Sequence, residues 1–122
     1  TPCWNRIRKL EEEGVITQKV AILNNSKINL PIVVFLSISV SHHTEEWLKK
    51  FSDTVNKHDQ IMEVYRITGS NIDYLLKIVS PTISEYDKFQ QKLIGEIEFN
   101  NMTSGIALKE IKKSSSLPLD YL

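Results

Sequence analysis

The chain has 122 residues, which is the length of one ordinary domain with a single core. Hydrophobic residues make up 41% and charged residues 25%, a globular composition that argues against disorder. Fifteen basic and fifteen acidic side chains cancel, so the chain as a whole lacks the strongly basic balance that is typical of a DNA-coating surface.

The single cysteine, Cys3, excludes an intrachain disulfide and fits a reducing cytoplasm, which is the location we expect. No stretch reaches the roughly 18 apolar residues that a membrane span requires, so we expect no membrane partner. The opening Thr-Pro-Cys-Trp differs from a signal peptide. Because the chain has no initiator Met and begins inside a motif described below, we expect that a segment upstream is missing.

The first predicted element is a helix over residues 1–13. Thr1 can cap this helix, Pro2 suits its first position and Gly14 is a natural stop. An apolar stripe at spacing three runs along it, formed by Trp4, Ile7 and Leu10. Residues 15–23 are then predicted to form a strand. A turn is predicted after it at Asn24-Asn25-Ser26, because these residue types favour turns.

The rest of the chain alternates strand and helix signals. Strands are predicted over residues 32–40, 61–68, 72–79 and 103–112, and helices over residues 44–58 and from Thr82 to about residue 97. Thr44 can cap the first of these helices, and Thr82 begins a capping box with Glu85 in the second. Residues 114–118 read as loose chain.

This order of strand, helix, strand, strand, helix, strand is typical of the split β-α-β, ferredoxin-like arrangement. We therefore predict an α+β fold, in which one antiparallel sheet carries both helices on one face. The other face of the sheet needs a cover, and a second subunit is the expected one.

Two motifs resemble a known family. Residues 1–16, Thr-Pro-Cys-Trp-Asn-Arg-Ile-Arg-Lys-Leu-Glu-Glu-Glu-Gly-Val-Ile, resemble the recognition-helix signature of Lrp/AsnC (feast/famine) transcription regulators. Thr68-Gly69, followed by Asp73-Tyr74-Leu75-Leu76, resembles the effector hairpin of the same family. The resemblance covers essentially the whole chain. Two features depart from the family pattern: the first helices of the helix-turn-helix are absent, and three residues instead of two separate Gly69 from Asp73.

The resemblance implies three regions. Residues 1–14 would be the C-terminal part of the recognition helix, residues 15–29 a linking strand and hinge, and residues 30–122 an amino-acid-sensing and oligomerisation domain. Operator DNA would be a partner of the full-length protein, with contacts implied for Thr1, Pro2, Arg6, Arg8 and Lys9. From charge alone, the interpretation we favour for these basic residues is a solvent-exposed helix face without a DNA contact. Because this chain lacks the scaffold helices, we expect it to bind its operator poorly.

The resemblance also implies a free amino acid as effector, bound at the contact between two dimers. One wall would come from the hairpin, with Gly69, Ser70, Asn71 and Asp73, and the opposite wall from Met102 and Ser104 of another subunit. Backbone N–H groups freed by a positive φ at Gly69 would suit the ligand's carboxylate, and Asp73, free of a basic neighbour, would pair with its ammonium. Methionine or leucine is the preferred ligand. We expect dimers that assemble further into a ring such as an octamer. The alternative reading of this hairpin is a plain turn.

Other chemistry has little support in the sequence. The adjacent His42 and His43 lie on opposite faces of an extended chain, so we read them as a polar loop and expect no metal or other cofactor. Cys3 reads as a small buried residue, not a nucleophile. Because no catalytic motif is present, we predict that the protein is not an enzyme. Two alternatives stay open: a stand-alone amino-acid-binding module without DNA binding, and a small dimeric ferredoxin-like enzyme such as an oxygenase.

Overall fold

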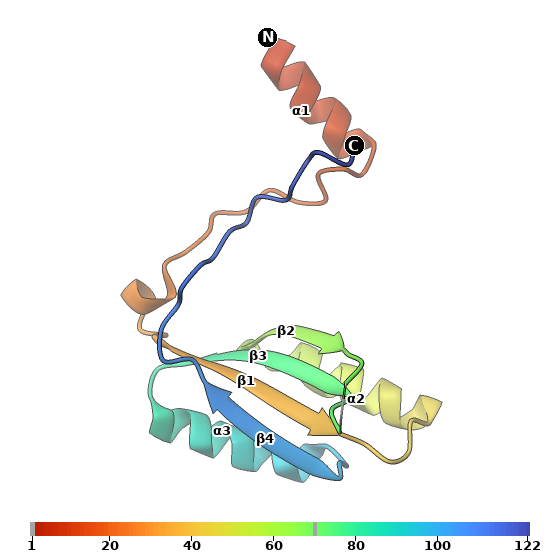
Figure 1. The fold of residues 1–122 in the computed structure, drawn as a ribbon, viewed down its shortest axis with the longest axis vertical. Helices are drawn as coiled ribbons and strands as arrows, with labels where there is room; N and C mark the ends of the chain where they lie inside the picture. The colour runs from red at the N-terminus through yellow and green to blue at the C-terminus, as the bar shows by residue number, and fades with distance from the viewer. Residues whose placement is uncertain (1, 70) are drawn as a thin grey trace.

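A computed structural model describes residues 2–69 and 71–122, and its main folded unit contains a four-stranded antiparallel sheet (Figure 1). The elements are α1 (Pro2–Glu12), a 3-10 helix η1 (Asn25–Ile28), β1 (Ile32–Ser39), α2 (Glu45–Lys57), β2 (Ile61–Arg66), β3 (Tyr74–Ser80), α3 (Ile83–Glu96) and β4 (Asn101–Ile106). The strand order is β2-β3-β1-β4, and every neighbouring pair is antiparallel. The predicted α+β, ferredoxin-like order is confirmed.

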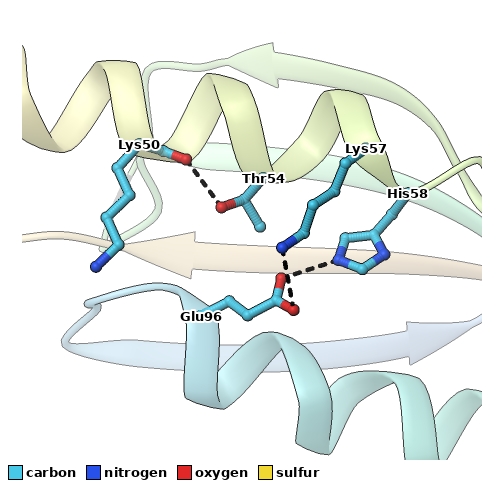
Figure 2. A network of polar contacts seen from close by, with 5 residues as sticks. All are labelled: Lys50, Thr54, Lys57, His58 and Glu96. Carbon is cyan, nitrogen blue, oxygen red and sulfur yellow. Dashed lines mark hydrogen bonds and ion pairs between the residues drawn. The ribbon is translucent and has the colours of Figure 1, made fainter.

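One face of the sheet is covered by helices. Side chains alternate between the two faces of a strand, and in β1 the fully buried ones are Val34, Leu36 and Ile38. They form one cluster with side chains from β3, α2 and α3: Tyr74, Leu76, Ile78, Trp47, Phe51, Tyr86, Phe89 and Leu93. Because both helices contribute to this cluster, they cover the same face, and both lie in front of the sheet in Figure 2.

The other face of the sheet is open in the single chain. Its rows follow from the strand register: Phe35 lies between Lys77 and Gly105, and Ser37 lies between Leu75 and Thr103. Phe35 is 41% exposed, although it sits in the middle of a strand. Because no described helix packs on this face, Phe35 and its neighbours are available for contact with another chain.

The two packed helices begin where the sequence predicts. Thr44 Oγ1 accepts a hydrogen bond from the Trp47 amide at 3.0 Å, and Thr82 Oγ1 accepts one from the Glu85 amide at 3.0 Å. The reciprocal half of the predicted capping box is replaced by an ion pair, because the Glu85 carboxylate lies 3.4 Å from Lys88 Nζ. The predicted caps of α2 and α3 are confirmed.

The N-terminal segment is simpler than predicted. Helix α1 ends before Gly14, which adopts the left-handed conformation with φ 78°, as expected of a glycine stop. The strand predicted over residues 15–23 is wrong, because these residues form no strand. Among the described residues, no strand lies beside this segment to supply hydrogen bonds, and a lone strand is not stable. None of the α1 residues from Pro2 onward is buried, so the expectation that Cys3 is a buried residue is wrong.

The last strand is shifted from its predicted place. It was expected over residues 103–112 but spans Asn101–Ile106. The final bridge joins Val34 to Ile106, and one further hydrogen bond runs from the Ala107 amide to the Val33 carbonyl. Because β1 begins at Ile32, no partner backbone remains for residues beyond 107, which are exposed.

In the described part of the chain, every helix is too short or too polar to cross a membrane.

Candidate functional site

The hairpin between β2 and β3 carries the predicted effector-binding residues. It is closed by a hydrogen bond from the Ile67 amide to the Asp73 carbonyl at 3.0 Å. Gly69 and Asn71 are exposed at its tip, and Ser70 lies outside the described residues. The left-handed residue is Asn71, with φ 62°, whereas Gly69 is not in that region. The positive φ was therefore predicted at the wrong residue, although asparagine also tolerates it.

Asp73 follows the hairpin tip and is tied to the end of β1. Its amide donates to the Ile38 carbonyl at 2.9 Å, and its Oδ2 accepts from the Val40 amide at 2.8 Å. The carboxylate therefore has a hydrogen-bond partner in its own chain, which was not predicted from the sequence. It is however free of a basic neighbour there, because Lys77 lies 3.8 Å from Glu63 on the open face. One carboxylate oxygen is held, and the negative charge has no ion pair among the described residues.

Met102 and Ser104, the predicted opposite wall, lie in β4 on the helix-covered face. Their register partners are Ile38 and Leu36, which are fully buried. The Ser104 hydroxyl lies 2.6 Å from the Tyr86 hydroxyl, where either oxygen can donate, and burial raises the pKa of the Tyr86 hydroxyl. Ser104 is thus engaged with α3, while Met102 lies beside Ile38, at the same end of the sheet as Asp73.

Helix α1 presents the predicted DNA-contacting residues. Pro2, Arg6, Arg8 and Lys9 are exposed, and Thr1 lies outside the described residues. Lys9 Nζ lies 3.9 Å from Glu13, which is a weak surface pair. Lys19, from the segment after the helix, lies 3.1 Å from Glu11 and 5.5 Å from the centre of the Trp4 ring. A basic, exposed helix surface is what contact with phosphate groups requires.

A polar network that sequence reasoning missed joins the ends of α2 and α3 (Figure 2). Buried His58 Nε2 lies 2.9 Å from Glu96 Oε2, and Lys57 Nζ lies 3.4 Å from Glu96 Oε1. The hydrogen bond with His58 holds the pKa of the Glu96 carboxyl below its usual range, and electrostatic attraction to His58 and Lys57 adds to this effect. His58 and Glu96 are 38 residues apart, so a local sequence pattern could not predict their contact. The network ties the two helices together.

The comparison with protein families decides the identity. Residues 33–117 match the Lrp/AsnC ligand binding domain. The chain belongs to the Lrp/AsnC family. Its membership was predicted from the motifs at residues 1–16 and around Asp73, and that prediction is confirmed.

Curated relatives are transcription regulators by name. The glutamate uptake regulatory protein of Zymomonas mobilis is 41% identical over 117 residues, which cover 96% of this chain and 71% of the relative. A DNA-binding transcriptional activator of Escherichia coli is 33% identical over 121 residues, which cover 98% of this chain and 79% of the relative. Both alignments extend beyond the sensing domain into the region of α1.

Solved structures share the fold. An AsnC family transcriptional regulator from Agrobacterium tumefaciens superposes with a TM-score of 0.92 at 45% identity, covering 100% of this chain and 79% of that one. A transcriptional regulator of Neisseria meningitidis in complex with L-methionine gives 0.90 at 28% identity, covering 99% and 78%. The family therefore contains a member that holds an amino acid on this fold.

Proposed function

We propose that this chain is the amino-acid-responsive and assembly part of a DNA-binding transcription regulator. The observation that carries the proposal is the Asp73 carboxylate, held at the end of the sheet by one backbone amide and left without a cation. A carboxylate oriented in this way is suited to the α-ammonium of a free amino acid. The methionine complex of the Neisseria relative supports this ligand class.

The effector pocket lies between two dimers in this proposal. The hairpin of one subunit, with Gly69, Ser70, Asn71 and Asp73, supplies one wall, and Met102 and Ser104 of another subunit supply the other. Exposed backbone at the hairpin tip offers N–H groups to the ligand's carboxylate. Ser104 keeps acceptor capacity beyond its contact with Tyr86, since a hydroxyl has two lone pairs. The thioether of Met102 favours an apolar ligand side chain such as that of methionine or leucine.

Calorimetry with a panel of the twenty amino acids tests the effector site. We expect one or a few amino acids to bind the wild type. Asp73→Asn keeps an oxygen to accept from the Val40 amide but removes the charge, so it should bind at least about tenfold more weakly, as expected when a charged hydrogen bond is lost. Asp59→Asn, a change of an exposed carboxylate in the loop after α2, is the matched control. If no amino acid binds the wild type, the proposal fails.

DNA binding is proposed for α1, with contacts from Thr1, Pro2, Arg6, Arg8 and Lys9. The exposed basic residues of this helix and its inclusion in the alignment with a DNA-binding activator support the assignment. Selection from a random duplex library by the full-length protein, followed by gel shifts, provides the probe. Arg6→Ala and Arg8→Ala should weaken binding of the selected duplex, whereas Lys27→Ala in η1 should not. Retention of wild-type affinity by both arginine variants would remove α1 from the DNA-contacting surface.

A further inference from the structure

The loop between β1 and α2, residues 40–44, is held by hydrogen bonds to two segments, one at Asp73 and one at Asn100. On one side the Val40 amide donates to Asp73 Oδ2 at 2.8 Å. On the other side the Asn100 side-chain amide donates to the Ser41 hydroxyl, and the Asn100 backbone amide donates to the Ser39 carbonyl at 2.7 Å. Asn100 directly precedes β4, where Met102 lies. This loop therefore joins the two segments that carry the proposed pocket walls.

The same loop also packs on the residue after Asp73. The His43 ring lies 5.8 Å from the Tyr74 ring and 5.9 Å from the Trp47 ring, centre to centre. The Tyr74 side chain is 4% exposed, and its hydroxyl forms no hydrogen bond with any described residue. A buried hydroxyl without a partner is unfavourable and calls for an explanation. The His43 ring, which lies against the Tyr74 ring and belongs to an exposed loop, carries a nitrogen of the kind that can accept such a hydrogen bond.

We propose that the loop of residues 40–44 is a positioning element of the effector site, which holds Asp73 through Val40 and closes onto Tyr74 through His43 when the effector binds. This inference rests on the effector site proposed above. The loop adds a regulatory step to that site, because it connects occupancy at Asp73 with the start of β4.

The physical basis is preorganisation of the carboxylate. With Oδ2 held by a backbone amide, the other oxygen points in a fixed direction, so less conformational freedom is lost when an ammonium binds. An ammonium at Asp73 polarises the carboxylate and changes its bond to Val40, which alters the loop on which His43 and Ser41 lie. A loop with two arrangements that differ in affinity for the ligand couples the hairpin to β4.

Two variants and one control test the positioning role by calorimetry with the amino acid that binds the wild type. Asn100→Ala removes the donor to Ser41 from an exposed residue, and we expect the effector dissociation constant to rise roughly three- to tenfold, the effect of one hydrogen bond. Its control is Lys49→Ala, an exposed change in α2 outside this loop, which should bind as the wild type does. His43→Ala should weaken binding in the same way. Equal affinities for Asn100→Ala, His43→Ala and the wild type would overturn the inference.

Tyr74→Phe separates positioning from packing, because it deletes only the hydroxyl. The free protein should be as stable as the wild type or more stable, since an unpaired buried group is removed, while effector binding weakens. A loss of stability without a loss of affinity would mean that the hydroxyl is merely structural and would overturn the closing step.

Hydrogen exchange supplies a readout that a structural role would not move. Saturating effector should slow exchange in the peptides that span residues 40–47 and 97–103, in addition to the hairpin. Slowing confined to residues 67–74 would contradict the coupling. A wild type that binds no amino acid would refute the proposed function itself, which keeps the two failures distinct.

Discussion

The two faces of the sheet are built from the same strands but meet different partners. On the helix-covered face, alternate β1 side chains such as Leu36 are fully buried within one chain, whereas their neighbour Phe35 on the other face is 41% exposed. The first set of residues folds the single chain. The second set contributes little to that fold and is available for association. Because successive side chains of a strand point to opposite faces of the sheet, one residue contributes to folding and the next is available for assembly.

The largest expected effect is on the covered face. Leu36→Ala should lower the free energy of unfolding by about 2–5 kcal/mol, because it leaves a cavity in a packed core. Ser37→Ala, on the opposite face, should change it by no more than about 0.5 kcal/mol. Urea unfolding followed by circular dichroism, at one fixed protein concentration, measures both. Similar losses for the two variants would mean that the faces are not divided in this way.

The second effect concerns the open face. We expect the wild type to be at least dimeric, and Phe35→Glu should raise the dimer dissociation constant at least about a hundredfold, because it places a charge in a desolvated contact. Ile83→Glu, which changes an exposed apolar residue at the start of α3, should leave association unchanged. Sedimentation or light scattering at micromolar concentration gives the answer. A wild type that stays monomeric there would remove the open face as an interface.

A smaller effect is expected at the contact between β4 and α3. Ser104→Ala leaves the hydroxyl of the buried Tyr86 without its partner and should cost about 1 kcal/mol of unfolding free energy. Combining it with Tyr86→Phe should cost less than the sum of the two single changes, as for a direct hydrogen bond. Strict additivity would show that the two hydroxyls do not interact in solution.

The smallest effect depends on pH. The pKa of Glu96 is lowered in the folded state, so its contribution to stability is present above the unfolded value of about 4.3 and is lost as the pH falls through the folded pKa. Glu96→Gln should therefore lower the melting temperature by roughly 1–3 °C at pH 7, and the difference should shrink as the pH falls through the lowered pKa of Glu96. Glu98→Gln, at an exposed neighbour, serves as the control. If the difference in melting temperature between the wild type and Glu96→Gln grew as the pH was lowered, the stabilising role of the Glu96 carboxylate would be contradicted.

Local periodicity predicted most of the sheet domain, since β1, α2 and α3 each carry a pattern that matches one buried face. Prediction from local periodicity failed for segments whose strand structure depends on pairing with another strand. Residues 15–23 have apolar residues but no neighbouring strand, and β4 ends where β1 offers no further backbone. A strand exists by pairing, which a single stretch of sequence does not encode.

In the candidate site, too, some features were predicted from local sequence and others depend on contacts between distant residues. The motif located the hairpin and Asp73, because short motifs preserve local spacing. The bond from Val40 to Asp73 spans 33 positions, and the pairing of Ser104 with Tyr86 depends on which face of β4 points toward α3. Such contacts follow from topology, so they were beyond the reach of spacing arguments.

The two outer strands of the sheet differ in a way that bears on aggregation. Strand β2 has a bulge between Ile61 and Glu63 and carries charged side chains, which discourage the addition of a foreign strand. Strand β4 has no charged residue and no proline along Asn101–Ile106, so its outer backbone groups form an unprotected template. During heating or overexpression, we expect ordered aggregates of this chain to grow from β4, and a lysine at the exposed Thr103 to slow them.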